Sequence, residues 1–393
     1  MSEPTKKRSR IQRWRVLIIL VATVWLAWRI YTTPSPKPVT PPAFEGDSKD
    51  LKETVVVPTL DAPIPTGQNV IWCASFVSAW KKIEADVTGE PPALEGNPAI
   101  VESLNKAPDP RPDIPPSSLY VAAGWNQKGI LQTIASDLKK QFPGKAIPSF
   151  PGIAPEAFVA YSYLEAKAAF NIPYFQNDEP LVFTDRAGRE AQVSSFGIRP
   201  KDEYAYGGLR NQPSILYLNR EKKFSTPSEY IVDLDRSSHP NQIILAQIEP
   251  KATLAETVAY ADKKIAEGIV VTMGEGLEVT DVLLVPDIVW NISQRFTELE
   301  GRAFTNSQLK GQRPDVVQQD IAFRLDRYGA EIRSEFKMPC LPVSTHYIFN
   351  RPFLLYMKKR GATQPYFAMW VENAELLAKW KPEAGNEASS PSK

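Results

Sequence analysis

The last sixty residues show the clearest pattern of apolar and polar positions in the chain. Two apolar, aromatic-rich runs, residues 352–357 and 366–371, flank a turn that holds two lysines, an arginine and Gly361. Charged residues and a glycine in this position end an apolar run and let the chain reverse. The two runs therefore predict a β-hairpin whose strands lie in the hydrophobic core.

A second pattern lies just before this hairpin. Apolar Ile321, Phe323 and Leu325 alternate with polar residues, and Gly329 then breaks the alternation. A period of two is the signature of a half-buried strand. The stretch that follows, residues 330–347, contains two prolines and scattered charges, which predicts a long loop; loops of about this length in compact domains are usually functional or disordered.

Helical and strand periods share the rest of the chain and predict an α+β fold. An apolar stripe at helical spacing, or a composition rich in helix formers, predicts helices over residues 76–83, 128–142, 156–169 and 253–267. Strand-like runs occur at residues 117–124, and several of them follow one another between residues 183 and 249, separated by turn residues. Residues 276–302 predict one strand, ending near Trp290, and a short helix.

The order of these parts resembles the serpin family, and residues 69–376 take part in the resemblance. In that family a strand of the large sheet runs through a glycine hinge into an exposed reactive-centre loop, and the chain returns through a run similar to residues 349–355 here. The closing residues 366–373 look like the last strand of that family. The resemblance implies a multi-sheet α+β domain with surrounding helices, in which the strand before Gly329 lies in the middle of the large sheet.

The same resemblance implies roles for particular residues. The reactive-loop hinge would be Gly329, Ala330 and Glu331. The side chains nearest the scissile bond would be Met338, Cys340 and Leu341. Asn69 is the asparagine that survives from the family's shutter motif, and Asn171 opens a second family-like pattern on a central strand, so both are shutter candidates.

Serpin inhibition requires the cleaved loop to insert as a new strand between existing strands, so the residues after the hinge should be small and uncharged. The present chain instead has three charged residues and two bulky apolar ones soon after Gly329. Burial of an unpaired charge costs several kcal/mol. We therefore expect a serpin-like domain that does not inhibit a protease.

The N-terminus carries a separate signal. Residues 1–15 are basic, and residues 16–28 form an uninterrupted apolar run that extends to residue 31 if Arg29 snorkels to the interface. No small-residue cleavage motif follows, so an uncleaved single-pass signal anchor at residues 16–31 is favoured over a cleaved secretory signal. The positive flank keeps residues 1–15 in the cytoplasm and places the rest outside it.

Composition completes the predicted organisation. Residues 32–66 are rich in proline and threonine and predict an extended linker, residues 67–380 the serpin-like domain, and residues 381–393 a polar tail. Seven basic residues and one acidic residue precede position 30, which leaves the remaining chain a net charge of −5 out of the total of +1. A negative domain disfavours nucleic acid as a partner.

Catalytic and metal-binding patterns are sparse. The chain has two histidines, His239 and His346, and lacks the common hydrolase, zinc and phosphate-binding motifs. We expect no enzyme activity, metal or cofactor. The two cysteines, Cys73 and Cys340, do not make a disulfide framework, and whether they pair is left open.

These observations predict a membrane-tethered, extracytoplasmic serpin-like protein that binds or scaffolds another protein without inhibiting a protease. One alternative is an active serpin-type inhibitor of a serine or cysteine protease. The other is an α+β envelope ectodomain unrelated to serpins.

Overall fold

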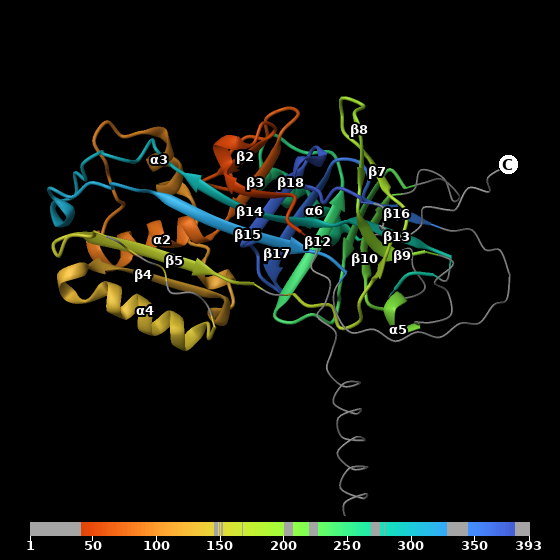
Figure 1. Ribbon diagram of the computed structural model, residues 1–393, viewed down its shortest axis with the longest axis horizontal. Coiled ribbons are helices and arrows are strands. Elements are labelled where there is room, and N and C mark those ends of the chain that lie inside the picture. The colour runs from red at the N-terminus through yellow and green to blue at the C-terminus, as the bar shows by residue number, and fades with distance from the viewer. Residues whose placement is uncertain are drawn as a thin grey trace, which may run out of the picture. The chain divides into compact units, whose positions relative to one another are not determined.

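Figure 1 shows the computed structural model of the protein. The structure describes residues 41–144, 148, 150, 152–166, 168–199, 207–219, 227–268, 276–278, 280–327 and 345–381. The chain divides into two compact units, Met1–Pro41 and Pro42–Lys393. All helices and strands named below belong to the second unit.

The largest sheet has seven strands, and the predicted C-terminal hairpin lies inside it. The strand order is β10 (Ser214–Asn219), β11 (Glu229–Asp233), β12 (Asn241–Gln247), β17 (Phe353–Lys359), β18 (Phe367–Val371), β3 (Asn69–Cys73) and β2 (Thr54–Val57). All neighbours are antiparallel except β2 and β3. The hairpin prediction is confirmed: Gly361 supplies a left-handed turn residue with φ +79° between β17 and β18.

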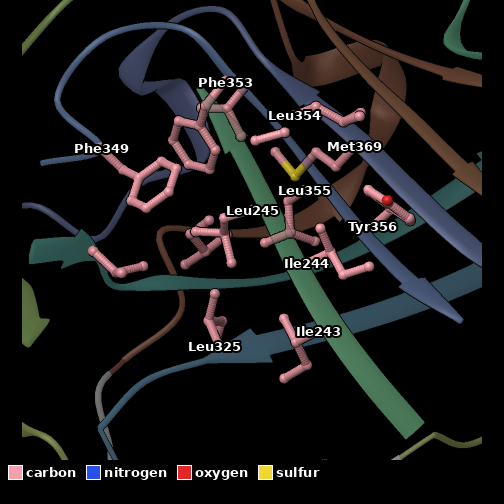
Figure 2. Packing of buried hydrophobic residues seen from close by; sticks show 14 of the residues in the cluster. Ile243, Ile244, Leu245, Leu325, Phe349, Phe353, Leu354, Leu355, Tyr356 and Met369 are labelled. Carbon is pink, nitrogen blue, oxygen red and sulfur yellow. The ribbon is translucent and has the colours of Figure 1, made fainter. Parts of the chain in front are cut away.

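The core is centred on β12 and β17, which pair through Ile244 with Tyr356 and Leu245 with Leu355. Figure 2 shows these side chains together with Leu325 from a neighbouring sheet. The hairpin strands are apolar at successive positions because both of their faces are covered. On one face Tyr356 donates a hydrogen bond to Asp262 Oδ1 of helix α6 (Leu254–Glu267) at 2.8 Å.

A three-stranded sheet covers the other face of the hairpin. It consists of β1 (Phe44–Asp47), β14 (Ile288–Arg295) and β15 (Gln318–Leu325). Phe323 of β15 stacks on Phe367 of β18 with ring centroids 4.6 Å apart, and Trp290 of β14 lies 6.3 Å from the same ring. The inward positions of β15 are the ones that the alternating pattern predicts, so the predicted strand is confirmed.

The remaining strands form smaller sheets. The four-stranded sheet is β16 (His346–Ile348), β13 (Val282–Pro286), β9 (Ser195–Ile198) and β6 (Phe175–Gln176); the pairs are β4 (Leu119–Trp125) with β5 (Phe158–Leu164) and β7 (Leu181–Thr184) with β8 (Glu190–Val193). Gly197 is required where β9 meets β13. A Cβ atom there would lie 1.8 Å from the carbonyl oxygen of Leu283.

Helices are concentrated in the N-terminal half. They are α2 (Ser75–Ile83), followed by a π-helical turn Glu84–Thr88, then α3 (Ala99–Lys106), α4 (Ile130–Gln141), the short α5 (Gly207–Arg210) and α6; 3-10 turns occupy Ser48–Asp50, Arg111–Asp113, Pro116–Ser118, Asn126–Lys128, Ser307–Leu309 and Ala374–Leu376. The helices predicted from residues 76–83, 128–142 and 253–267 are confirmed. In Figure 1, α2 and α4 lie against the β4–β5 pair, where Ile134 and Leu138 are buried.

Two predicted elements differ from the structure. Residues 156–169 were expected to be helical, but Phe158–Leu164 form β5, whose seven residues all pair with β4. Tertiary pairing outweighs the helix-forming alanines and glutamates because the aromatic and branched side chains suit a half-buried pleat. Between residues 276 and 302 the structure has two strands, β13 and β14, where one strand and a short helix were expected.

The predicted linker at residues 32–66 is wrong from residue 42 onward. Strand β1 pairs in parallel with β14, and Ala43 N donates a hydrogen bond to Val289 O at 2.6 Å. The apolar residues of β2 extend the large sheet beside β3. This segment folds because its branched apolar side chains cover open sheet edges, so the folded unit begins near Pro42 and not at residue 67.

The predicted anchor at residues 16–31 lies outside the described residues, as do residues 1–15 and 382–393. Within the part of the chain that the structure describes, no helix is long and apolar enough to cross a bilayer. The predicted α+β class is confirmed by the mixture of sheets and helices.

The hairpin core can be tested with a matched pair of valines. Val371 in β18 is fully buried, whereas Val316 is 62% exposed. Val371→Ala should lower the free energy of unfolding by about 2–3 kcal/mol, because it removes two methyl groups and leaves a cavity. Val316→Ala should change it by less than about 0.5 kcal/mol. Equal effects in denaturant titrations of the two variants would contradict the proposed role of the hairpin.

Candidate functional site

Strands β15 and β5 lie beside each other without forming a ladder. Before the strands, Gln312 Nε2 donates to the carbonyl oxygen of Glu156 at 3.4 Å. Beyond their ends, Tyr174 N donates to Arg327 O at 3.1 Å. Because contacts join the chain before both strands and again after both, β15 and β5 run in the same direction, as Figure 1 also shows.

Ser75, the first residue of α2, bridges the two strands from beneath. Gln319 of β15 donates its Nε2 hydrogen to Ser75 Oγ at 2.8 Å and to Cys73 O at 3.1 Å. From the other side, Ser162 Oγ of β5 donates to the carbonyl oxygen of Ser75 at 2.6 Å. Both strands therefore approach within side-chain reach of one residue. We call these three residues, Ser75, Ser162 and Gln319, the Ser75 bridge.

Each of these two strands has one partner among the described strands. β15 pairs with β14, and β5 pairs with β4. On an antiparallel strand every second residue directs its N–H and C=O groups away from the existing partner. The facing edges of β15 and β5 thus direct backbone N–H and C=O groups into the same interval without a ladder between the two strands, which is the arrangement that accepts an added strand.

An added strand between β15 and β5 would run antiparallel to both. A chain that leaves the end of β15 and turns back has this direction, and residues 328–344 follow β15 immediately. This makes the interval between β15 and β5 the candidate functional site.

The outer and inner surfaces of β15 differ in chemistry. On the exposed surface Asp320 accepts hydrogen bonds from Ser293 Oγ at 2.6 Å and from Gln318 Nε2 at 2.9 Å. Burial, followed by the charge of Asp320, raises the pKa of Tyr161 on β5. On the inner surface the side chains are packed: Ile321 is buried and Phe323 is stacked on Phe367. An inward side chain of an added strand would meet a filled layer.

Cys73 lies next to the Ser75 bridge but is not a reactive thiol. It is buried and not disulfide-bonded, and its Sγ lies 3.5 Å from Ser75 Oγ. Burial raises the pKa of the Cys73 thiol, and the hydrogen bonds from Ser75 oppose this only partly. A protonated thiol is a weak nucleophile. Because Cys73 is free, the structure shows no Cys73–Cys340 bond, and Cys340 itself lies outside the described residues.

Asn69, a predicted shutter residue, holds the end of the hairpin. Its Nδ2 donates to Thr54 Oγ1 at 3.0 Å and to Asn373 Oδ1 at 2.8 Å, and its Oδ1 accepts from the backbone N–H groups of Glu372 and Asn373. These bonds join β2, β3 and the end of β18. The contacts described for Asn69 do not include the Ser75 bridge.

Asn171, the other shutter candidate, lies in a different network. Its Nδ2 donates to Ser237 Oγ at 2.6 Å, and its backbone N–H donates to Asp235 Oδ2 at 3.2 Å. Through these bonds it fixes the segment after β5 to the turn before β12. The described contacts do not bring Asn69 and Asn171 together, and a shutter role for either stays a prediction.

The predicted loop residues, Gly329, Ala330, Glu331, Met338, Cys340 and Leu341, all lie outside the described residues. The structure describes the two ends of this segment. The chain leaves β15 through Arg327, and it returns at Thr345, whose N–H donates to Asp281 Oδ1 at 2.7 Å. It then enters β16, which is parallel to β13 in the four-stranded sheet.

The position of β15 differs in one respect from the serpin-type expectation. The strand before Gly329 was expected in the middle of a large sheet, but in the described hydrogen-bonding pattern β15 is the edge of a three-stranded sheet. The reason is that β5, which lies on the open side of β15, does not pair with it through the backbone. The two strands are joined through the Ser75 bridge instead.

The residues of the Ser75 bridge were not predicted from the sequence. One signal was available for Gln319, because it occupies an inward position of an alternating strand whose other inward residues are apolar. A buried amide at such a position needs a hydrogen-bond partner. Nothing in the sequence indicated that Ser75 would be this partner, since it lies 244 positions away.

Possible metal ligands and the two histidines do not point to a different candidate site. Among the described residues, no group of three His, Cys, Asp or Glu side chains could hold a metal ion. His239 lies in the turn before β12, and His346 opens β16.

Comparisons with known proteins find similarity in structure alone. No family model and no curated protein matches the chain. The match with human thyroxine-binding globulin complexed with thyroxine covers 78% of this chain and 92% of that protein's chain, with 12% identity and a TM-score of 0.45. Mouse protein Z-dependent protease inhibitor covers 78% and 91%, with 16% identity and a TM-score of 0.45. The thermophilic serpin tengpin in its native state covers 79% and 90%, with 13% identity and a TM-score of 0.45.

These proteins are serpins, the family that the sequence resembles. At these identities and TM-scores the similarity describes the fold and nothing finer.

The Ser75 bridge makes a direct prediction for stability. Ser75→Ala removes the hydroxyl that Gln319 contacts and leaves a buried amide with one acceptor fewer, so we expect a loss of about 1–3 kcal/mol of unfolding free energy. Ser136→Ala, on the exposed side of α4, is the matched control and should cost less than about 0.5 kcal/mol. Chemical denaturation measures the free energy of unfolding of both variants. An unchanged value for Ser75→Ala would show that the bridge does not stabilise the fold.

Proposed function

We propose that the chain is a non-inhibitory, serpin-like domain that binds or scaffolds another protein, tethered to a membrane with the domain outside the cytoplasm. The observation that carries the non-inhibitory part is a mismatch between the residues that follow β15 and the interval beside it. The interval offers backbone edges for a strand, but its inner side is packed and bridged.

The mismatch appears in either side-chain frame. Successive residues of a strand face opposite surfaces. In one frame the inward residues of an inserted segment include Ile332 and Phe336, which would have to displace packed groups near Phe323 and the Ser75 bridge. In the other frame the inward residues are Glu331, Arg333 and Glu335, each of which would be buried at a cost of several kcal/mol unless it is paired.

Insertion would also compete with contacts that already exist. The Gln319–Ser75 and Ser162–Ser75 hydrogen bonds connect β15 and β5 from beneath the interval that an added strand would enter. Each such bond contributes about 1 kcal/mol net, and more if a partner is left buried and unsatisfied. The closed interval is therefore favoured over one that holds a charged or bulky strand.

One alternative is favoured by a specific observation. The edges of β15 and β5 run in the same direction and form no ladder with each other, so they are suited to an antiparallel strand, and residues 328–344 are attached at the correct end. These features support a serpin-type inhibitor of a serine or cysteine protease. The two functions differ in whether a cleaved loop enters the interval.

Cleavage of the loop tests this difference. The full chain is nicked between residues 332 and 344 with a nonspecific protease, and the thermal midpoint is measured before and after. We expect a change of less than about 3 °C. Each kcal/mol shifts the midpoint by about 2–4 °C in domains of 150–250 residues, so a rise above about 10 °C would mean insertion worth several kcal/mol and would favour the inhibitor.

A matched variant shows whether the side chains are the cause. Replacing Glu331, Arg333 and Glu335 with serine, and Ile332 and Phe336 with alanine, supplies the small uncharged run that insertion needs. This variant should gain a rise in thermal midpoint after nicking that the parent chain lacks. If neither chain gains stability after nicking, insertion is prevented by the packing between β15 and β5 and not by the loop sequence.

The tether is proposed from the sequence of the first 31 residues. A basic segment followed by an apolar run at residues 16–31 supports an anchor with residues 1–15 in the cytoplasm. Alkaline extraction of membranes should leave the full chain in the pellet, whereas a chain that begins at Thr32 should be released. Mature protein that starts after Tyr31 in the pellet would overturn the anchor.

A further inference from the structure

A buried carboxylate lies next to the end of β15, the first strand of the candidate site. Asp287 is the single residue between β13 and β14, and its side chain is completely buried. Its backbone is fixed on both sides: its N–H donates to Ser194 O at 2.9 Å, and its carbonyl oxygen accepts from Ala378 N at 2.8 Å. The carboxylate therefore cannot reach solvent without movement of the surrounding segments.

The Asp287 carboxylate is only half satisfied. Oδ2 accepts a hydrogen bond from Gln176 Nε2 of β6 at 2.7 Å. Oδ1 is buried and has no hydrogen-bond partner in the structure. An ionised carboxylate has about four acceptor sites and is strongly destabilised when it is buried with so few donors. Protonation removes the charge and most of this cost.

The charged neighbours of Asp287 belong to the segment where the chain leaves β15. Asp326 opposes its ionisation, whereas Arg327 and Arg324 favour it. Asp326 is itself paired with Arg324 at 2.9 Å. From β6 the facing group is the neutral Gln176, and the contacts described from Ser194 and Ala378 are backbone bonds. Burial dominates this balance and raises the pKa of Asp287 from 3.8 to about 7.

We propose that Asp287 is a proton-sensitive latch that holds the end of β15 in place when it is protonated and loosens it when it is ionised. The reasoning is one of linkage. A buried group that binds its proton more tightly in the closed state than in water must favour any open state, once it ionises, in which it is hydrated. The β15 exit is adjacent to Asp287, because the next residue, Ile288, pairs with Leu325 at the end of β15. The exit is held to the segment after β5 by the bond from Tyr174 N to Arg327 O.

The sign of the pH dependence follows directly. The folded-state pKa lies above the reference value of 3.8, so the stabilising effect of the bound proton is complete below about pH 3.8 and is lost as the pH rises toward 7. Above that point both closed and open states are ionised, and the dependence levels off. Acidification should tighten the β15 exit at residues 326–327, and neutralisation should loosen it.

Hydrogen exchange of the Tyr174 amide reports this opening directly. In the full chain, after correction for intrinsic exchange, protection of this amide should fall at least tenfold between pH 5.5 and pH 8.0. Asp287→Asn is uncharged at every pH and should show less than a twofold change over the same range. Protection that does not depend on pH in the unmodified chain, or an equal dependence in Asp287→Asn, would overturn the proposal.

Two further variants separate a latch from a purely structural role. Gln176→Leu removes the hydrogen bond to Oδ2, so it should move the midpoint of the pH profile upward; this variant decides the matter if Asp287→Asn fails to fold. Asp281→Asn is the control, because Asp281 is a buried carboxylate that accepts backbone N–H bonds from Thr345 at 2.7 Å and Glu278 at 3.1 Å. Asp281→Asn should keep the pH dependence of Tyr174 protection seen in the parent chain. Loss of this dependence in the control would show that Asp287 is not its specific cause.

Discussion

The packing of the C-terminal hairpin is the constraint on which the rest of this structure depends. Strands β17 and β18 lie in the interior of the seven-stranded sheet, with α6 on one face and the three-stranded sheet on the other. A strand covered on both faces is expected to be apolar over its covered length. This holds for all of β18 and for β17 up to its two terminal lysines. Because β17 and β18 come from the end of the chain, the seven-stranded sheet is completed only after the last strands are present.

The candidate site arises where the hairpin core meets the N-terminal helices. Strand β15 is fixed from below by the stacking of Phe323 on Phe367, while its outer edge forms no ladder with any described strand. Helix α2 begins directly after β3, and its first residue, Ser75, reaches both β15 and β5. The same junction that closes the core therefore also sets the interval in which a further strand could lie.

Sequence periodicity predicted the elements with strong patterns and failed where pairing partners decided the outcome. The hairpin, β15 and α6 were predicted because each has one dominant period and clear ends, such as Thr253, whose Oγ1 caps the first turn of α6. Strand β5 was mistaken for a helix, and the segment that forms β1 and β2 was mistaken for linker. Both segments become strands because an open sheet edge is available to them, which is information that a local window does not contain.

By itself the sequence determined the α+β class, the core hairpin, the serpin-like order of parts and the charged, bulky character of the segment after β15. Only the tertiary structure decided which residues meet: Ser75 with Gln319 and Ser162, and Asp287 with Gln176 and the charges at the β15 exit. The physical reason is that local patterns report how each side chain partitions between water and interior. The burial of a particular carboxylate or amide, and the partners that satisfy it, depend on segments more than a hundred residues apart.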